Sequence, residues 1–567
     1  MAANEIRLSG IDFKAGPRPN DDGLRIDCSN ITILVGPNNS GKSRTLVEIE
    51  ALCSGSDIAE LNVVRDIHLS RPDTAEDILD AVKIFERPPN PGESVGANGI
   101  FLFRPGVRAG ENDINFQIDR NSYGIWLSHL NSDSEKQLRR HSTSLFTARL
   151  DGRTRFQLVD AKSTGDLDAT PKNHLWNLFV DDKKRNIIRD FTREAFGKFF
   201  VIDPTGMSNF KIRLSDRPPD DTNEEQSLDQ RARLFHSSAT PITEMGDGIQ
   251  TSVGLLSAVV SLPAKILLVD EPEAFLHPAL ARRLGKFLCN NIRQRDASLV
   301  VSTHSSEFML GCVQASPNLR IVRLSYDKGI ATARSIEPDR VRSLMLDPLL
   351  RSAHAMRAMF HRGVVVCEAD ADRAFYEEVN SRLNAVEEGI EDSFFMNAQN
   401  WQTIPRIVVP LREVGVAAAA IFDFDVLMDR DFAPIWALVP ASEHELIDMQ
   451  TSRNMLKAAM EMAGRKRCKA EGLSCLDSAT SETARRLLAQ FARYGVLFVP
   501  VGELERWMPG ILGKAASKSN WLMEIFMAMG SDPSDPAYLT AGTGGVWDFI
   551  RLAKVWIDDP SRPGFVS

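Results

Sequence analysis

The sequence has no long hydrophobic run, no paired-cysteine motif and few aromatic residues. No stretch of the 567 residues reaches the roughly 18 apolar positions that a membrane span needs, and the amino end lacks the apolar segment of a secretory signal. The seven cysteines are odd in number and form no Cys-x-x-Cys pair, which argues against a disulfide framework and a zinc ribbon. We therefore expect a cytoplasmic protein with reduced thiols and no membrane partner.

The remaining composition is that of an ordinary globular protein, with 43% hydrophobic, 25% charged and 7% aromatic residues. At roughly 100–200 residues per domain, the length predicts about three or four domain-sized units. Because the net charge is −9, contact with DNA would have to come from local basic patches. Residues 183–185 and 465–467 are two such patches, and the alternative for each is a solvated helix face.

A phosphate-binding pattern stands near the amino end. The β-branched run at 31–35 leads into Gly-Pro-Asn-Asn-Ser-Gly-Lys-Ser at 36–43, and a helical pattern follows. Strand, glycine loop and helix together predict a P-loop, in which Lys42 reaches the terminal phosphates of ATP and Ser43 ligates Mg²⁺. The residues expected around the nucleotide are Gly36, Asn38, Asn39, Ser40, Gly41, Lys42, Ser43 and Arg44.

Two further buried-strand patterns, at 265–270 and 298–303, are separated by a helical stretch and predict a parallel sheet. Asp270 stands at a strand end, where it can hold Mg²⁺, and Glu271 is the candidate base that orients the attacking water. His304 follows the next strand, near the expected γ-phosphate. In this order, the P-loop, Asp-Glu-Pro-Glu and Thr-His resemble the ABC-type ATPases of the chromosome-maintenance and RecF-like branch.

That resemblance implies a site completed in trans by a signature segment from a second protomer. The nearest candidate is 244–252, which lacks the usual Ser-Gly-Gly order. Gln157 is a candidate for the glutamine loop of the family, and an ordinary surface residue is the alternative.

A second α/β pattern, beginning at residue 363, carries acidic residues where its strands should end. Glu368 closes the first strand pattern, with Asp372 one helical turn further on. Asp423 and Asp425 follow the apolar run 415–422 with a spacing that, in an extended strand, points both side chains the same way. Carboxylates at the carboxyl edge of a parallel sheet can bind one or two Mg²⁺ or Mn²⁺ ions, although acidic residues also commonly end strands without any ligand.

With Glu503 and Glu505 after a later strand, these positions resemble the Toprim fold of topoisomerases, primases and nucleases, with Ala369 where that family usually has glycine. The resemblance implies catalytic roles for Glu368, Asp423 and Asp425, and a catalytic lysine that is either Lys514 or Lys554. The metal ligands that it implies are Glu368, Asp372, Asp423, Asp425 and Glu505, with Glu503 as the alternative to Glu505.

An ABC-type ATPase followed by a Toprim domain resembles the OLD (overcoming lysogenization defect) nucleases, which include the Gabija nuclease subunit and retron-associated relatives. The resemblance implies an α/β ATPase domain over 1–345 with an insertion at 56–195 for dimerisation or a second lobe. A linker at 346–362 and a nuclease domain over 363–567 with a helical insertion at 442–493 complete this organisation. The implied function is a metal-dependent DNA endonuclease, regulated by its ATPase domain, in anti-phage defence. The implied partners are DNA, further copies of the chain as a dimer or tetramer, and an accessory defence protein or retron RNA/DNA.

Two other functions compete with this hypothesis. A topoisomerase needs a nucleophilic tyrosine, and none of the five tyrosines has a winged-helix context ahead of the Toprim-like segment. An ATP-driven DNA-binding switch or scaffold, in which an inactive Toprim domain recruits another effector, is the alternative from a different class. The presence of all the main carboxylate positions favours the nuclease.

Overall fold

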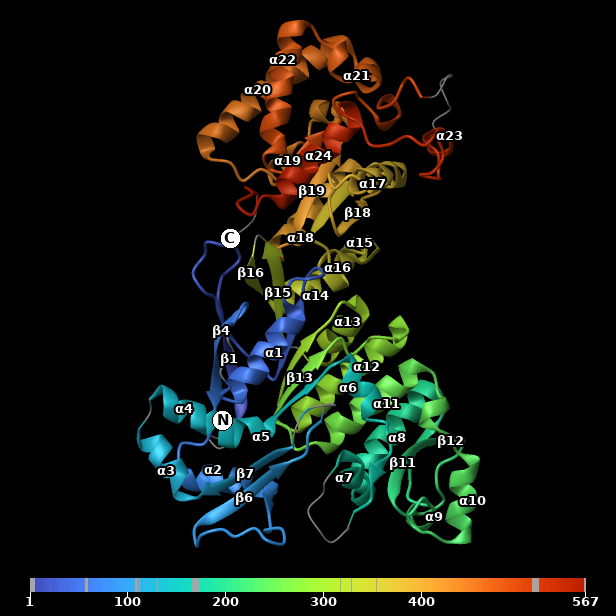
Figure 1. Cartoon of the computed structure of the whole chain (residues 1–567). Helices are drawn as coiled ribbons and strands as arrows, with labels where there is room; N and C mark the ends of the chain where they lie inside the picture. Colours follow the sequence, from blue (N-terminus) through green and yellow to red (C-terminus); the bar gives the residue numbers. More distant parts are fainter. Residues whose placement is uncertain are drawn as a thin grey trace. The chain divides into compact units, whose positions relative to one another are not determined.

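The computed structural model describes residues 6–56, 60–107, 111, 113–129, 131–165, 173–316, 318–327, 329–352, 354–511 and 520–564. The chain divides into two compact units (Figure 1). The first comprises residues up to Pro338 apart from 17–19 and 36–40, and the second comprises those short segments and the chain from Asp339 onward. None of the described helices is long and apolar enough to cross a membrane. The seven cysteines are free thiols, as their spacing predicts.

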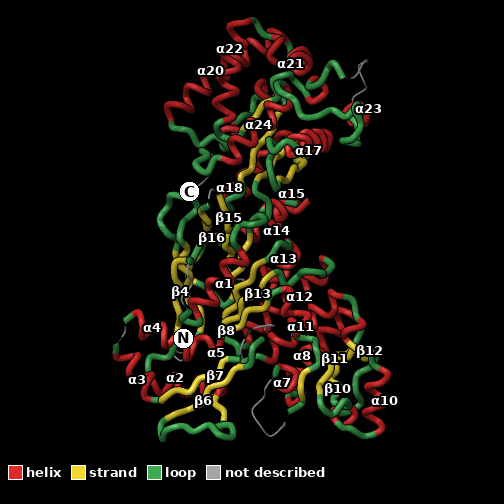
Figure 2. Tube along the Cα trace, in the orientation of Figure 1, coloured by secondary structure: helices red, strands yellow, loops and turns green. Residues whose placement is uncertain are grey.

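A six-stranded sheet forms the centre of the first unit within the described chain (Figure 2). Five of its strands are parallel, and the edge strand β16 runs antiparallel to its neighbour. β3 and β14 are buried along their whole length, as expected for strands covered by helices on both faces. The α/β class and parallel sheet predicted from the sequence are therefore confirmed. The strand order is β16 (Ile330–Ile336), β15 (Arg320–Asp327), β3 (Ile31–Val35), β14 (Ser298–Ser302), β13 (Ile266–Asp270) and β8 (Thr147–Leu150).

The range 56–195, expected as an insertion, is only partly separate from the rest of the first unit. Its strand β4 (Val64–Ser70) pairs with β1 (Arg7–Phe13), and β8 joins the central sheet beside β13. The sequence did not reveal β8 because a four-residue strand carries too little periodicity to be recognised. The remaining strands form small antiparallel sheets: β2 (Arg25–Asp27) beside β1; β5 (Glu86–Arg87), β6 (Gly99–Arg104) and β7 (Ile114–Asp119); and β9 (Lys162–Ser163), β10 (Phe199–Asp203), β11 (Asn209–Ser215) and β12 (Thr240–Pro241).

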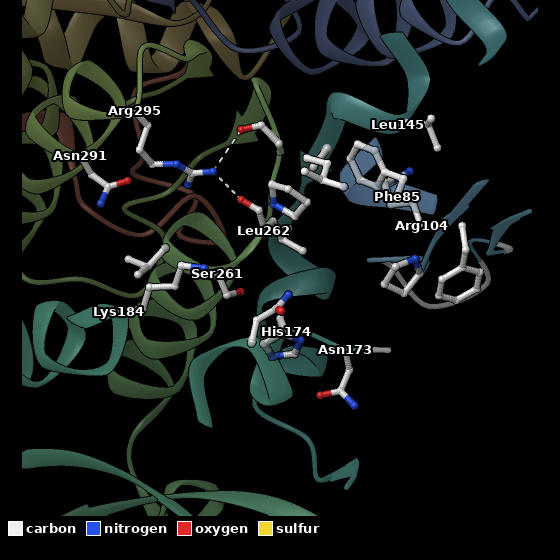
Figure 3. Close-up of a pocket in the computed structure, with 18 of the residues that line it drawn as sticks. Phe85, Arg104, Leu145, Asn173, His174, Lys184, Ser261, Leu262, Asn291 and Arg295 are labelled. Carbon is white, nitrogen blue, oxygen red and sulfur yellow. Dashed lines mark hydrogen bonds between the residues drawn. The ribbon is translucent and has the colours of Figure 1, made fainter. Parts of the chain in front are cut away.

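Helices cover the sheet of the first unit and leave a cavity of about 620 Å³ near the amino ends of β8 and β13 (Figure 3). α11 is buried along most of its length, and α12 begins with a proline at its first turn, where a missing N–H is tolerated. The helices nearest the functional positions are α1 (Lys42–Cys53), α6 (Gly152–Gln157), α7 (His174–Val180), α8 (Asp182–Phe196), α11 (Asp247–Ser261), α12 (Pro278–Gln294) and α13 (Ser306–Ala315).

The described part of the second unit contains a parallel sheet in the order β18 (Ser393–Asn397), β17 (Gly363–Cys367), β19 (Ala417–Phe422) and β20 (Val496–Phe498). The chain passes from β17 to β18 on one side and then crosses to place β19 on the other side of β17. Such a reversal of strand order opens a crevice at the carboxyl ends of β17 and β19, the usual position of a ligand site in this type of sheet. The principal helices are α17 (Asp370–Asn384), α18 (Ile404–Glu413), α20 (Glu443–Ala463), α21 (Arg465–Glu471), α22 (Ser478–Ala492), α23 (Trp521–Met529) and α24 (Gly545–Asp558).

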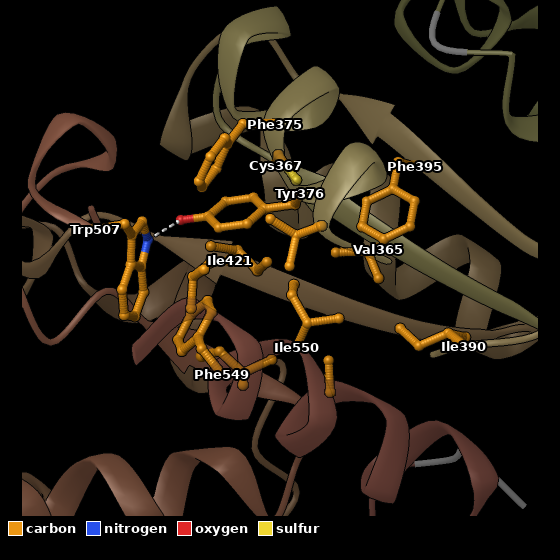
Figure 4. Close-up of a cluster of buried hydrophobic side chains, with 14 of the residues drawn as sticks. Val365, Cys367, Phe375, Tyr376, Ile390, Phe395, Ile421, Trp507, Phe549 and Ile550 are labelled. Carbon is orange, nitrogen blue, oxygen red and sulfur yellow. Dashed lines mark hydrogen bonds between the residues drawn. The ribbon is translucent and has the colours of Figure 1, made fainter. Parts of the chain in front are cut away.

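One face of this sheet is covered by α17 and α24 (Figure 4). Val365 of β17 packs there with Tyr376 of α17 and Ile550 of α24, all fully buried. The indole N–H of Trp507 donates to the Tyr376 hydroxyl at 2.9 Å, and burial raises the pKa of this tyrosine. Tyr376 therefore serves the core.

Arg412, near the end of α18, is a second buried anchor of this unit, and its guanidinium lies 4.7 Å from the ring centre of Trp556 on α24. Its guanidinium is buried and donates to the carbonyls of Ala418 at 2.9 Å, Leu438 at 2.9 Å and Tyr494 at 2.8 Å. Burial lowers the pKa of Arg412 to about 9. The carbonyl dipoles thus stabilise the buried charge. The same hydrogen bonds link α18 to β19 and to the segment before β20.

Replacing Arg412 with methionine should lower the free energy of unfolding by about 3 kcal/mol, because three buried carbonyls lose their donor. Chemical denaturation of the full chain measures this loss. Arg406→Met, which removes an exposed arginine from the same helix, should change the free energy of unfolding by less than about 0.5 kcal/mol. Equal stability of the two variants would contradict the anchoring role.

Candidate functional site

The predicted P-loop connects β3 to α1. Gly36 and Gly41 have φ values of 143° and 91°, and Asn39 has a φ of 57°. These left-handed conformations turn the chain sharply before α1, whose first residue is Lys42. A side chain at Gly41 would also meet Val63 at 2.9 Å. The loop is therefore shaped to present backbone N–H groups at a helix N-terminus, as phosphate binding requires.

The side chain of Arg44, a residue expected around the nucleotide, turns back along α1. Its Nε donates to Glu48 Oε1 at 2.8 Å, and its Nη2 donates to the Glu60 carbonyl at 2.7 Å. Glu48 is fully buried and also accepts the Val64 N–H at 2.8 Å, so it attracts the guanidinium back along α1. The Arg44 side chain thus supports the segment that follows the helix.

Ser43 and Asp270 come together across the sheet. Ser43 Oγ donates to Asp270 Oδ1 at 3.0 Å, and the Ser302 hydroxyl donates to the same oxygen. Asp270 is the last residue of β13 and lies beside Ser302 in the parallel register. A hydroxyl and a carboxylate at hydrogen-bond distance beside a P-loop are oxygen donors of the kind that Mg²⁺ prefers. These residues fit the predicted magnesium ion of the ATPase site.

Glu271 and His304 face each other at the carboxyl ends of β13 and β14. Glu271 Oε1 lies 3.6 Å from His304 Nε2, and both side chains are partly exposed. Glu271 has a φ of 46°, and its N–H donates to the Ser302 carbonyl at 3.0 Å. This unusual backbone conformation turns the carboxylate out of the sheet edge, where a base must lie to reach a substrate water.

Glu273 has a positioning role that the sequence analysis did not assign. Its Oε1 accepts the Thr303 hydroxyl at 2.7 Å and the His304 N–H at 2.9 Å. Burial raises the pKa of Glu273. The buried carboxyl therefore fixes the turn that carries His304.

Arg155 was also missed by the sequence analysis. It lies on α6, is 1% exposed, and donates from Nη1 to the Glu271 carbonyl at 2.8 Å. α6 packs closely on α11, because a Cβ at Gly254 would lie 2.1 Å from the Arg155 carbonyl oxygen. Burial lowers the pKa of Arg155, and the charges of Glu273, Asp270 and Glu271 oppose that shift. Arg155 thus positions the main chain of the candidate base, two residues before Gln157.

Arg155→Met should lower kcat for ATP hydrolysis about tenfold and leave KM for ATP within twofold, because it releases the Glu271 main chain without touching the P-loop. Steady-state phosphate release measures both constants. Arg153→Met, which removes an exposed arginine from the same helix, is the matched control and should behave as wild type. An unchanged kcat in the Arg155 variant would contradict the positioning role.

In the second unit, Glu368 and Asp423 lie at the crevice between β17 and β19. Glu368 directly follows β17, and Asp423 directly follows β19, its parallel neighbour. Burial raises the pKa of Asp423 to about 7, with further contributions from the carboxylates of Glu368 and Asp372. Burial and the Asp372 charge likewise raise the pKa of Glu368. Because these carboxylates repel one another, a bound cation would stabilise their charged forms.

Asp372 and Asp425 reach this edge by different local structures. Asp372 Oδ2 accepts the Ala369 N–H at 2.9 Å and so caps the start of α17. Asp425 lies in a 3₁₀ turn, Phe424–Met428, and the strand ends at Phe422. The expectation that the pleat of a strand aligns Asp423 with Asp425 is therefore wrong, and the tight turn brings them together instead.

The loop after β20 joins the same edge, because the Phe424 N–H donates to the Gly502 carbonyl at 3.1 Å. Glu503 follows at once and is buried. Glu505 lies in the turn Leu504–Arg506 and is partly exposed. Both glutamates are thus carried to the carboxyl edge of the sheet, and the choice between them as a ligand stays open.

Two cations of α21 lie among these carboxylates. Lys469 Nζ is 3.4 Å from Asp423 Oδ2 and 4.0 Å from Asp425 Oδ1. Arg465, one helical turn earlier, has Nε 3.2 Å from Asp425 Oδ2 and Nη2 2.8 Å from Asp429 Oδ2. Arg465 belongs to the basic run 465–467, predicted from the sequence as a patch that could guide DNA, and no role was predicted for Lys469.

The other basic residues that were considered lie elsewhere. Lys554 pairs with Asp558 at 2.6 Å on α24, and Lys514 lies outside the described residues. Arg185 is buried and pairs with Glu225 at 3.2 Å, so it does not belong to an exposed basic patch. Lys183 remains exposed on α8.

Among the residues that the structure describes, no three His, Cys, Asp or Glu side chains converge closely enough to hold a metal ion. The carboxylate cluster in the second unit is instead bridged by Lys469 and Arg465. Its donors are all carboxylate oxygens, the chemistry that Mg²⁺ and Mn²⁺ prefer, so the donor type suits these ions although the described side chains do not converge on one point.

Comparison with known proteins supports the ATPase half most directly. Residues 78–310 match a family model described as "AAA domain, putative AbiEii toxin, Type IV TA system". Over 104 residues, the chain is 33% identical to an OLD nuclease of Thermus scotoductus. That match covers 18% of the chain and 19% of the relative, so the chain spans about a fifth of that protein's length. The first unit therefore carries an ATPase-type domain.

Solved structures with detectable similarity include an Smc head and a component of an ABC transporter complex. An Smc head bound to the winged-helix domain of ScpA has a TM-score of 0.35 at 13% identity, covering 59% of this chain and 99% of that one. CbiO1 of Clostridium perfringens, part of an ABC transporter complex, has a TM-score of 0.29 at 12% identity, covering 62% and 98%. These scores are too low to carry an argument, so the fold rests on the strand order given above.

Proposed function

We propose that the protein is an ATP-hydrolysing, divalent-metal-dependent DNA endonuclease of the OLD type, whose ATPase domain regulates cleavage. One observation carries the nuclease half: Glu368 and Asp423 lie at the switch point of a parallel sheet, with the pKa of Asp423 raised to about 7. A buried carboxylate with this perturbation, next to other carboxylates, is characteristic of a functional site. The similarity to the Thermus OLD nuclease supports the same conclusion.

The ATPase reaction follows from the residues at the carboxyl edge of the first sheet. The P-loop N–H groups and Lys42 bind the phosphates, while Ser43 and Asp270 hold Mg²⁺. Glu271 accepts a proton from the attacking water, and Arg155 and Glu273 fix the main chain around Glu271 and His304. His304, 3.6 Å from Glu271, orients the base.

The nuclease reaction assigns Glu368, Asp423 and Asp425 as metal ligands, with Asp372 and Glu505 completing the set. Mg²⁺ or Mn²⁺ bound there supplies the charge that activates water and stabilises the leaving 3′ oxygen. Lys469, whose Nζ lies 3.4 Å from Asp423 Oδ2, would be close enough to this edge to donate its ammonium group to an oxygen of the scissile phosphate. No side chain becomes covalently attached to DNA.

The biological setting proposed with this activity is anti-phage defence by a cytoplasmic homo-oligomer, since cleavage of both DNA strands needs two nuclease sites. An accessory defence protein or a retron RNA/DNA fits as an additional partner. These parts of the proposal rest on the resemblance to the OLD family.

The decisive experiment incubates supercoiled plasmid with the purified chain and Mg²⁺, Mn²⁺ or EDTA, each with and without ATP. We expect nicking or linearisation with a metal and none with EDTA. Lys42→Ala, tested in parallel, gives the sign of ATP control. ATP hydrolysis without cleavage under any of these metal conditions would overturn the nuclease half and favour the ATP-driven DNA-binding switch.

A further inference from the structure

We propose that the cavity of the first unit, at the amino ends of β8 and β13, is a binding site for a small aromatic organic anion. It lies at the opposite end of the strands from the P-loop chemistry: β13 runs five residues from this cavity to Asp270, or roughly 15 Å at strand spacing. The cavity measures about 620 Å³, within the range of small-molecule sites. The proposal is independent of the nuclease activity.

The charge of the wall selects an anion. Arg104, Lys184 and Arg295 line the cavity, and no aspartate or glutamate is among the lining residues that the structure describes. Lys184 has Asp181 at 3.5 Å outside the lining, and Arg295 donates to main-chain carbonyls, including that of Ala264 at 3.2 Å. The described lining therefore carries a net positive charge without a carboxylate in contact with the cavity.

Arg104 supplies the strongest single indication. Its side chain is 9% exposed, and Nη2 donates to Glu111 at 2.8 Å. Among the described residues, neither Nε nor Nη1 has an acceptor, although both are buried. Buried guanidinium N–H groups without acceptors are costly, and a carboxylate or phosphate would supply the missing oxygens.

A second unpaired group lies across the cavity. The buried Oδ1 of Asn291 has no donor among the described residues, and Figure 3 shows Asn291 and Arg295 on one side with Phe85 and Arg104 on the other. A ligand that spans the cavity can therefore pair its anionic end with Arg104 and give a donor to Asn291.

The rest of the wall selects an apolar, ring-shaped body. Phe85 and Phe103 contribute aromatic faces, and Ile187, Val260 and Leu262 contribute aliphatic surface. His174 shares the wall, and burial lowers its pKa to about 4, so it is neutral at physiological pH. Mononucleotides and aromatic carboxylates share the required chemistry of one anionic group on a flat ring system.

The test uses the full chain carrying Lys42→Ala, so that phosphate binding at the P-loop is removed. Isothermal titration calorimetry with AMP, 2-naphthoate and decanoate distinguishes a nucleotide, an aromatic carboxylate and a simple amphiphile. We expect AMP or 2-naphthoate to bind at one site per chain. Binding of decanoate alone, or of none of the probes up to 1 mM, would overturn the proposal.

Three variants locate the binding. Arg104→Met should weaken binding about tenfold or more, because it removes the charge-assisted hydrogen bonds and keeps the apolar volume. Asn177→Trp, which fills the cavity from α7 without changing its charge, should abolish binding. Lys183→Met removes an exposed cation of α8 that does not line the cavity and should bind within twofold of the parent. Unchanged affinity in both Arg104→Met and Asn177→Trp would contradict the assigned site.

Discussion

Glu271→Gln should lower kcat for ATP hydrolysis by two to three orders of magnitude while ATP still binds. The amide keeps the size of the side chain and loses the basic oxygen, and general-base catalysis typically contributes about 10²–10⁴-fold to a rate. Binding should persist because Ser43, Asp270 and the P-loop are untouched. Phosphate release gives kcat, and equilibrium binding of a fluorescent ATP analogue gives the affinity.

Glu194→Gln is the matched control, because Glu194 is an exposed residue of α8 whose ion-pair partner, Arg283, lies 4.0 Å away. It should hydrolyse ATP at the wild-type rate. If Glu271→Gln also kept its rate within threefold, another group would have to accept the proton. The backbone conformation of Glu271, with φ at 46°, would then need a different explanation.

The parts of the ATPase site that lie next to strands could be predicted from the sequence. The apolar runs before Gly36 and Asp270 are long enough to be recognised as buried strands, and the carboxyl ends of parallel neighbours must meet at one edge. The motif order therefore anticipates that Ser43 and Asp270 meet, at 3.0 Å. Their roles toward ATP and Mg²⁺ remain predictions.

Arg155 could not be predicted in the same way. It lies more than one hundred residues before Glu271, on a six-residue helix that follows a four-residue strand. Elements of this length have no clear hydrophobic period, and an arginine in a charged segment is usually solvated. Only the packing of α6 on α11, which Gly254 permits, shows that Arg155 is buried beside the candidate base.

The carboxylate site of the second unit could also be predicted only in part, because some of its residues come from elements far apart in the sequence. Glu368 and Asp423 could be proposed because each follows an apolar run directly. Lys469 could not, because the helices between β19 and β20 must fold back before α21 can reach the sheet edge. A basic run in a helical segment therefore indicated a solvated surface, whereas the fold places two of its cations on Asp423, Asp425 and Asp429.

Asp423→Asn should abolish metal-dependent DNA cleavage, with a loss of about a thousandfold or more, while ATP hydrolysis stays near the wild-type rate. The substitution removes a charge from the centre of the proposed ligand set and leaves the volume of the side chain unchanged. Because the buried carboxylate is repelled by Glu368 and Asp372, the neutral amide should not destabilise the fold without metal. Plasmid cleavage, phosphate release and thermal unfolding should be measured on the same preparation.

Asp431→Asn is the control, since Asp431 is exposed eight residues further along the chain. A folded Asp423→Asn protein that still cleaves plasmid at the Asp431→Asn rate would remove Asp423 from the metal site. The ligand set would then have to be rebuilt around Glu368 and the glutamates after β20. Loss of cleavage in Asp423→Asn alone, with ATP hydrolysis intact, would instead separate the two chemistries: the first sheet edge hydrolyses ATP, and the carboxylates between β17 and β19 cut DNA.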